Sequence, residues 1–103
     1  MNTKELLGLK VKEFRKQKKI TQEKLSELIA VDNGYISKLE VGQNFPSIST
    51  LEKIANALDV ELYELFIFTS DKQNDYNDEI ISIYERLNKE KQYTLYRVAK
   101  GLE

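Results

Sequence analysis

The chain has 103 residues, of which 41% are hydrophobic and 32% charged, and its formal net charge is −1. This length accommodates one domain, with or without a short appendage. Cysteine and histidine are absent, which excludes disulfides and cysteine-based zinc sites and removes the commonest general base. We therefore expect no metal, no cofactor and no enzymatic activity. Neither an apolar run of membrane-spanning length nor a signal-peptide pattern occurs, so we expect a cytoplasmic protein.

The first predicted helix spans residues 5–19, because Leu7, Val11 and Phe14 recur at helical spacing. Basic residues gather around its end, where positions 10–24 hold seven of them against two acidic ones. Such a local excess can face the phosphates of a nucleic acid, although taken alone it is more simply a solvated helix face. The seven are Lys10, Lys12, Arg15, Lys16, Lys18, Lys19 and Lys24.

Residues 20–42 predict two short amphipathic helices. Thr21 suits the N-cap of the first, whose apolar positions are Leu25, Leu28 and Ile29. The pattern breaks at residues 30–32, and Asp32 can cap the second helix, in which Ile36 and Leu39 point inward. The positions left outside are Asn33, Gly34, Ser37 and Lys38. Two helices at a fixed angle, one offering an amide and an amine outward, are what reading a DNA major groove requires.

Two further helices are predicted before residue 68. Residues 42–46 form a loop, and Ser47 or Ser49 caps a fourth helix, since Ser49 and Glu52 have capping-box spacing. The apolar stripe of that helix is Leu51, Ile54, Ala55 and Leu58. Residues 61–66 predict a short fifth helix. No alternating strand pattern occurs, so we predict an all-α fold.

The last third of the chain predicts a linker at residues 69–75 and two more amphipathic helices, with Asn88 ending one or capping the next. Their apolar faces carry Tyr76, Ile80, Tyr84 and Leu87, then Tyr93, Tyr96, Ala99 and Leu102. Two such helices cannot bury both faces alone, so they pack on the first domain or on another chain. The tyrosines favour core or interface over a ligand pocket or base stacking. The carboxylates Asp71, Asp75, Asp78 and Glu79 favour linker solvation and helix N-terminal charge over a cation site.

These motifs together resemble the Cro/phage-repressor (XRE) family of helix-turn-helix regulators over residues 6–66. The pattern is carried by Arg15, Thr21-Gln22, Tyr35-Ile36-Ser37, Leu39-Glu40-x-Gly42, Phe45-Pro46-Ser47, Leu51-x-x-Ile54-Ala55-x-Ala57-Leu58 and Leu62-x-x-Leu65. The resemblance implies a five-helix, lambda-repressor-like DNA-binding domain at residues 1–68. It also implies that a C-terminal helical hairpin at residues 76–103 is a dimerisation element.

The resemblance lends roles to particular residues. Those implied to contact bases are Asn33, Gly34, Ser37 and Lys38, and those implied to contact phosphates are Gln22, Tyr35, Gln43, Asn44 and Lys19. An asparagine can pair with adenine and a lysine with guanine, so the chemistry agrees. Arg15 and Glu40 resemble a structural pair that joins the first and third helices. The residues implied in dimerisation are Ile80, Tyr84, Leu87, Tyr96 and Leu102.

The chain departs from the family pattern at a few positions. Gln43 and Asn44 are neutral where the family often has Lys or Arg, and Val41 replaces a more usual polar residue, so a shallow salt dependence of DNA binding is expected. Ala30 stands where the family usually has Gly in the turn, and a left-handed alanine adds some strain there. Ser26 replaces a usual Ala and keeps the helix crossing tight.

The function expected from these residues is sequence-specific DNA-binding transcriptional regulation, most simply repression, by a homodimer on an inverted-repeat operator. The expected partners are double-stranded DNA and a second copy of the chain, with an anti-repressor protein as a further candidate and no membrane. The alternative is an XRE-like protein–protein interaction module or antitoxin, which the neutral loop favours. A restriction–modification controller is less well matched, because such proteins often end near the fifth helix.

Overall fold

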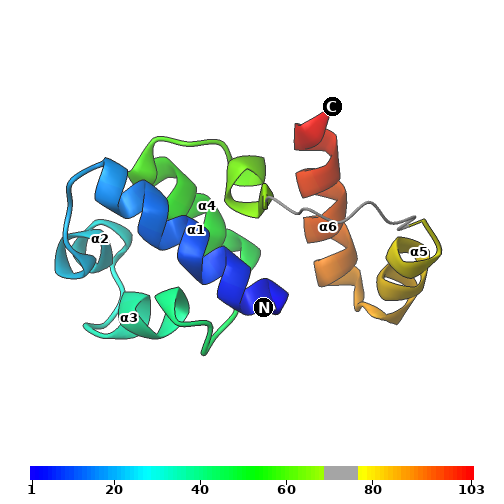
Figure 1. Ribbon diagram of the computed structural model, residues 1–103, viewed down its shortest axis with the longest axis horizontal. Helices are drawn as coiled ribbons and strands as arrows, with labels where there is room; N and C mark the ends of the chain where they lie inside the picture. The colour runs from blue at the N-terminus through cyan, green and yellow to red at the C-terminus, as the bar shows by residue number, and fades with distance from the viewer. Residues whose placement is uncertain (69–76) are drawn as a thin grey trace. The chain divides into compact units, whose positions relative to one another are not determined.

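The computed structural model describes residues 1–68 and 77–103, and every regular element in these ranges is a helix (Figure 1). The predicted all-α fold is therefore confirmed for the described part of the chain. Two compact units are present, residues 1–68 and residues 69–103. The predicted linker at residues 69–75 and the first residue of the predicted sixth helix, Tyr76, lie outside the described residues.

The first unit contains four α-helices and a 3-10 helix, which are α1 (Thr3–Gln17), α2 (Gln22–Ile29), α3 (Tyr35–Glu40), α4 (Ile48–Leu58) and η1 (Leu62–Phe66). The first helix is shifted by two residues from its predicted bounds. It begins earlier because Asn2 and Glu5 form a capping box, in which Asn2 Oδ1 accepts from Glu5 N at 2.9 Å. It ends earlier because Lys19 takes a left-handed conformation, with φ of 61°. The predicted fifth helix is the 3-10 helix η1.

The caps of α2 and α4 follow from short side chains at their starts. Thr21 Oγ1 accepts from Lys24 N at 2.9 Å, which confirms the predicted N-cap of α2. Ser47 Oγ accepts from Thr50 N at 3.2 Å, so Ser47 caps α4. The alternative capping box between Ser49 and Glu52 was wrong, because Ser49 already lies within the first turn of α4.

The start of α3 differs from the prediction. Its N-cap is Gly34, with φ of +97° and no side-chain capping bond, and the helix proper begins at Tyr35. The predicted cap by Asp32 was wrong, and Asn33 and Gly34 belong to the turn before the helix. Glycine reaches this positive φ without the steric penalty that a Cβ carries. The N-cap can therefore lie at Gly34, two residues after the predicted cap Asp32.

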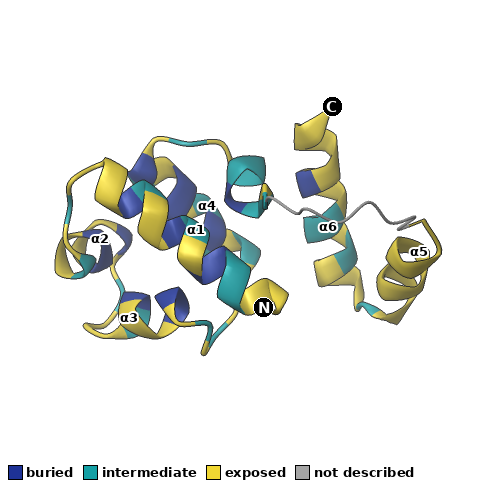
Figure 2. Cartoon of the chain, in the orientation of Figure 1, coloured by how far each residue is buried: buried dark blue, intermediate teal, exposed yellow. Residues whose placement is uncertain are grey.

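The core of the first unit forms where all five elements meet (Figure 2). Its buried members are Leu7, Val11, Leu25, Ile29, Ile36, Leu39, Leu51, Ile54, Ala55, Leu58 and Leu65. α1 packs against α3, α4 and η1, while α2 packs against α3 and α4. At the α1–α3 crossing a Cβ on Gly8 would lie 2.3 Å from the carbonyl oxygen of Leu39, so only glycine permits this approach.

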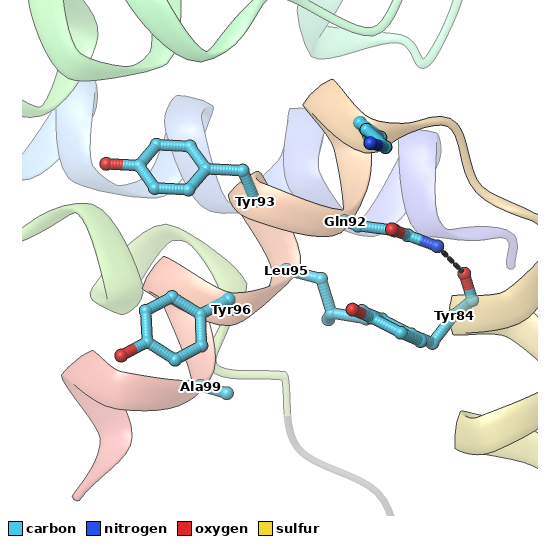
Figure 3. Close-up of a pocket in the computed structure, with 7 residues that line it drawn as sticks. Tyr84, Gln92, Tyr93, Leu95, Tyr96 and Ala99 are labelled. Carbon is cyan, nitrogen blue, oxygen red and sulfur yellow. Dashed lines mark hydrogen bonds between the residues drawn. The ribbon is translucent and has the colours of Figure 1, made fainter.

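The described part of the second unit, residues 77–103, contains α5 (Asn77–Arg86) and α6 (Lys89–Leu102). Asn88 caps α6, because its Oδ1 accepts from Lys91 N at 2.9 Å. Gln92 Nε2 of α6 donates to the carbonyl oxygen of Tyr84 at 2.9 Å, and the ring of Tyr84 points toward Leu95 (Figure 3). Every residue of α5 is exposed. The apolar side of this helix is therefore largely left open by α6.

Candidate nucleic-acid interface

A hydrogen-bonded ion pair joins α1 to α3. Arg15 Nε donates to Glu40 Oε2 at 2.7 Å and Arg15 Nη2 to Glu40 Oε1 at 3.1 Å, and both residues are buried. A third nitrogen, Arg15 Nη1, donates to the carbonyl oxygen of Ile20 at 2.9 Å. Each carboxylate oxygen of Glu40 therefore has a charged partner, which is what a buried ion pair requires in order to be tolerated.

Gln22 attaches α2 to the same cluster. Its Nε2 donates to Glu40 Oε1 at 2.9 Å, so Glu40 connects α3 to both preceding helices. This bond places the nitrogen of the Gln22 amide toward Glu40, and one of its two N–H groups remains for another acceptor. Ser26 supports the same turn of α2, because its buried hydroxyl donates to the carbonyl oxygen of Gln22 at 2.9 Å.

The turn between α2 and α3 begins at a left-handed residue. Ala30 has φ of 57° and ψ of 50°, and its N–H donates to the carbonyl oxygens of Glu27 and Ser26. This is the conformation that the resemblance implied for a position where glycine is usual. This conformation is sterically strained for alanine, because its Cβ approaches the following carbonyl oxygen.

The four residues expected to contact bases are all exposed, and they come from two pieces of backbone. Asn33 and Gly34 lie in the turn, while Ser37 and Lys38 lie on the solvent side of α3, opposite the buried Ile36 and Leu39. Apart from Gly34 and its two chain neighbours, no residue has a heavy atom within 4 Å of a Cβ built on Gly34, so its surroundings are open. All four residues are thus open to solvent, two of them in the turn and two on α3.

The residues expected to contact phosphates differ in how available they are. Lys19 and Gln43 are exposed, whereas Gln22, Tyr35 and Asn44 are half-buried. Tyr35 packs against the hydrophobic core, and Gln43 N donates to the carbonyl oxygen of Lys38 at 2.9 Å. Asn44 Oδ1 is buried without a hydrogen-bond partner among the described residues. Such an orphaned acceptor is costly unless a donor reaches it.

Part of the basic excess around α1 is neutralised locally. Lys10 Nζ lies 3.8 Å from Glu13 and 5.3 Å from the centroid of the Phe14 ring, and Lys18 Nζ lies 3.7 Å from Asp59. Lys12, Lys16 and Lys19 are exposed and take no part in an ion pair within the described ranges. The positive charge that remains for a polyanion is therefore smaller than the sequence count indicates.

Comparison with known proteins places this arrangement in a family. The profile described as "Helix-turn-helix" matches residues 11–65, more than half of the chain. The chain belongs to the helix-turn-helix family of the Cro/XRE type. The predicted resemblance is thereby confirmed. The matched residues run from within α1 to η1 and include the whole Arg15–Glu40–Gln22 cluster.

Relatives of this helix-turn-helix chain include named regulators. The HTH-type transcriptional regulator SinR of Bacillus subtilis (strain 168) is 31% identical over 83 residues, which cover 80% of this chain and 73% of SinR. The immunity repressor protein of Bacillus phage phi105 is 31% identical over 74 residues, covering 69% of this chain and 51% of that protein. The crystal structure of the restriction-modification controller protein C.AhdI from Aeromonas hydrophila matches with a TM-score of 0.58 at 37% identity, covering 60% of this chain and 94% of C.AhdI.

The helix-turn-helix match makes the chain a DNA-binding transcriptional regulator, as its motifs predicted. In the described residues no group of three side chains is placed to hold a metal ion. Nor does any helix there have the length and apolar character needed to cross a membrane. Sequence reasoning missed three features of the site, namely the close approach at Gly8, the bond from Arg15 to the carbonyl of Ile20, and the burial of Asn44 Oδ1. None of them leaves a local signal, because each depends on residues brought together by folding.

Proposed function

We propose that the chain is a repressor that binds an inverted-repeat operator as a homodimer, with α3 and the turn before it in the major groove. The observation that carries this proposal is the Arg15–Glu40–Gln22 cluster, which fixes α3 to α1 and α2 while the other side of α3 stays exposed. A recognition helix needs such a rigid mounting, because base readout depends on geometry within a fraction of an ångström. The names of SinR and of the phi105 repressor support the same assignment.

Within this proposal, Asn33 and Lys38 read base edges, with Ser37 assisting and the backbone of Gly34 approaching the DNA closely. An asparagine amide matches adenine N6 and N7, and a lysine donates to guanine O6 or N7. Gln22, Tyr35, Gln43, Asn44 and Lys19 contact phosphates. The second N–H of the Gln22 amide is suited to this, because the first is held by Glu40.

Residues 76–103, within the second unit, are proposed as the dimerisation element. A linker at residues 69–75 joins them to a DNA-binding domain at residues 1–68. The support lies in α5, where Ile80, Ile81 and Tyr84 are 52%, 55% and 45% exposed. In this proposal Ile80 and Tyr84 of α5 and Leu87 just after it face a partner, together with Tyr96 and Leu102 of α6. Two of these residues, Tyr84 and Tyr96, line the pocket drawn in Figure 3, whose other lining residues are Lys89, Gln92, Tyr93, Leu95 and Ala99.

The dimer is tested by sedimentation equilibrium on the full chain and two glutamate variants. Ile80→Glu places a charge on the proposed interface and should give monomers at concentrations where the wild type is dimeric. Ile67→Glu is the matched control, because Ile67 is a similarly exposed isoleucine, at 42%, outside α5 and α6. A monomeric wild type, or an unchanged mass for Ile80→Glu, would exclude the proposed interface.

DNA recognition is tested by selecting bound duplexes from a random pool with the full chain. The proposal expects enrichment of an inverted repeat, and loss of that enrichment in the double variant Asn33→Ala/Lys38→Ala. Binding without sequence preference would refute sequence-specific regulation. The same selection gives operators for the experiments that follow.

A second candidate function is protein–protein docking by an XRE-like module, as in an antitoxin. The observation that favours it is the uncharged surface after α3, where Val41 is 61% exposed and Gln43 and Asn44 carry no charge. DNA-cellulose retention of the full chain distinguishes the two, because a pure docking module would pass through. For the first candidate, the repressor, we also propose a cytoplasmic location and an anti-repressor protein that binds the second unit.

A further inference from the structure

Val41 is an exposed apolar side chain at the end of the recognition helix. It is the C-cap residue of α3 and 61% exposed. It follows Ser37 by four positions and Lys38 by three, so the three residues form one row along the outside of the helix. The remaining positions of the last turn, Leu39 and Glu40, are buried. Val41 therefore continues the row that carries the proposed base contacts.

The backbone around Val41 is anchored on both sides. Glu40 before it is held by Arg15 and Gln22. Gly42 after it has φ of +82°, its N–H donates to the carbonyl oxygen of Leu39 at 3.0 Å, and a Cβ placed on it would lie 2.7 Å from Glu5 Cγ. Because both neighbours are packed in place, the isopropyl group is presented to solvent in a defined position rather than on a loose loop.

The chemistry of a valine side chain limits what it can recognise on DNA. An isopropyl group donates no hydrogen bond, so it cannot hold a phosphate oxygen. The major groove has one apolar feature, the C5-methyl group of thymine, and small apolar side chains contact it. At about 1.5 Å of rise per residue, Val41 lies about 4.5 Å along the helix from Lys38. That span corresponds to roughly one base-pair step of about 3.4 Å.

We propose that Val41 is a specificity-determining residue that reads the methyl group of one thymine in each half-site, about one base pair from the pair read by Lys38. This inference rests on the proposed function, since it assumes that α3 lies in the major groove. It adds an apolar contact to a surface that has few charged ones. It also gives a role to a position that the family pattern leaves polar.

The test replaces each thymine of the selected operator, symmetrically in both half-sites, by deoxyuridine, which lacks only the C5-methyl group. Fluorescence anisotropy then measures the affinity of the full chain for each duplex. One substituted position should weaken the wild type by about fourfold per half-site, the value of one buried methyl group. Val41→Ala and Val41→Ser should bind the thymine and deoxyuridine duplexes equally at that position.

Leu28→Ala is the matched control, because Leu28 is 52% exposed on α2 and is not assigned to DNA. It should keep the full deoxyuridine penalty. Each Val41 variant should have the same melting temperature as the wild type, which would exclude a folding defect. An operator with no deoxyuridine-sensitive thymine, or a penalty that persists in both Val41 variants, would overturn the inference while leaving DNA recognition intact. Failure to select any operator would instead refute the proposed function.

Discussion

Arg15 of α1 holds Glu40 of α3 at two points, with Nε–Oε2 at 2.7 Å and Nη2–Oε1 at 3.1 Å. The side chain of Glu40 is 1% exposed and that of Arg15 is 10% exposed, so the pair lies in the protein interior. Each charge is solvated by the other and by the neighbouring Ile20 carbonyl and Gln22 amide. The orientation of the recognition helix therefore depends on a buried electrostatic contact as well as on the hydrophobic core.

Removing one member of this pair should destabilise the fold severely. Arg15→Met leaves the Glu40 carboxylate buried without its cation, and we expect a loss of about 3–5 kcal/mol in the free energy of unfolding, measured by urea titration. The double variant Arg15→Met/Glu40→Met should recover much of that loss, because no buried charge remains. Lys24→Met serves as the control, since the Lys24–Glu27 pair is exposed and worth about 1 kcal/mol or less. A single variant as stable as this control would contradict the argument.

Gly8→Ala should destabilise the first unit, although alanine is normally the better helix former. The added Cβ would lie 2.3 Å from the Leu39 carbonyl oxygen and 2.8 Å from that of Glu40. Overpacking of this kind typically costs about 1–3 kcal/mol, which exceeds the gain of about 1 kcal/mol in helix propensity. Thermal melting of Gly8→Ala and of Lys12→Ala, exposed on the same helix, measures the effect. A gain in stability for Gly8→Ala would show that α1 and α3 are less closely packed.

Ala30→Gly should stabilise the chain by about 0.5–1 kcal/mol, because glycine relieves the left-handed strain at φ of 57°. The control is Ala57→Gly in α4, where the backbone is helical and the same substitution should cost about 1 kcal/mol. Urea midpoints of the two variants should therefore move in opposite directions. If both fell together, the strain assigned to Ala30 would be absent.

Lys38→Ala and Lys19→Ala should weaken DNA binding in different ways. Lys38 is assigned to a base edge, so its loss should cost about 1–3 kcal/mol on the selected operator and little on unrelated DNA. Lys19 is assigned to a phosphate, so its loss should weaken binding to both DNAs alike and reduce the salt slope by about 1. Anisotropy titrations at several salt concentrations measure both quantities.

The wild-type salt slope gives a further check on this division. The neutral Gln43–Asn44 loop implies few ionic contacts, so the slope of log K against log salt should be shallower than the roughly −9 of a protein with ten phosphate contacts.

The Lys38→Ala experiment has its own contradicting outcome. If Lys38→Ala weakened binding to the selected operator and to unrelated DNA equally, Lys38 would not be a base-reading residue.

Most of the fold could be predicted because its signals are local. The inward positions Ile36 and Leu39 follow from helical spacing, and Thr21 and Asn88 are caps because a short polar side chain precedes a helix. The start of α3 could not be placed correctly, because a glycine N-cap offers no side-chain bond as a sequence signal and Asp32 looked like the better cap. Local chemistry thus predicts element type better than element boundaries.

The exposure of the proposed site could be predicted from the sequence, and the family resemblance implied the Arg15–Glu40 pair, but other contacts within the first unit could not be predicted. The exposure of Ser37 and Lys38 follows from helical periodicity. The bond from Gln22 to Glu40 spans 18 residues and the approach of Gly8 to Leu39 spans 31, so neither follows from spacing. Which atoms meet at those places depends on the angle between helices, and that angle is set by the assembled core.

The central claim, recognition of an inverted repeat by a homodimer, is tested most directly by the mass of the complex between the full chain and its selected operator. Native mass spectrometry should find two chains on a duplex whose half-sites lie about one helical turn apart. A duplex cut to a single half-site should bind much more weakly. One chain per full operator, or a selected sequence without two-fold symmetry, would contradict the claim.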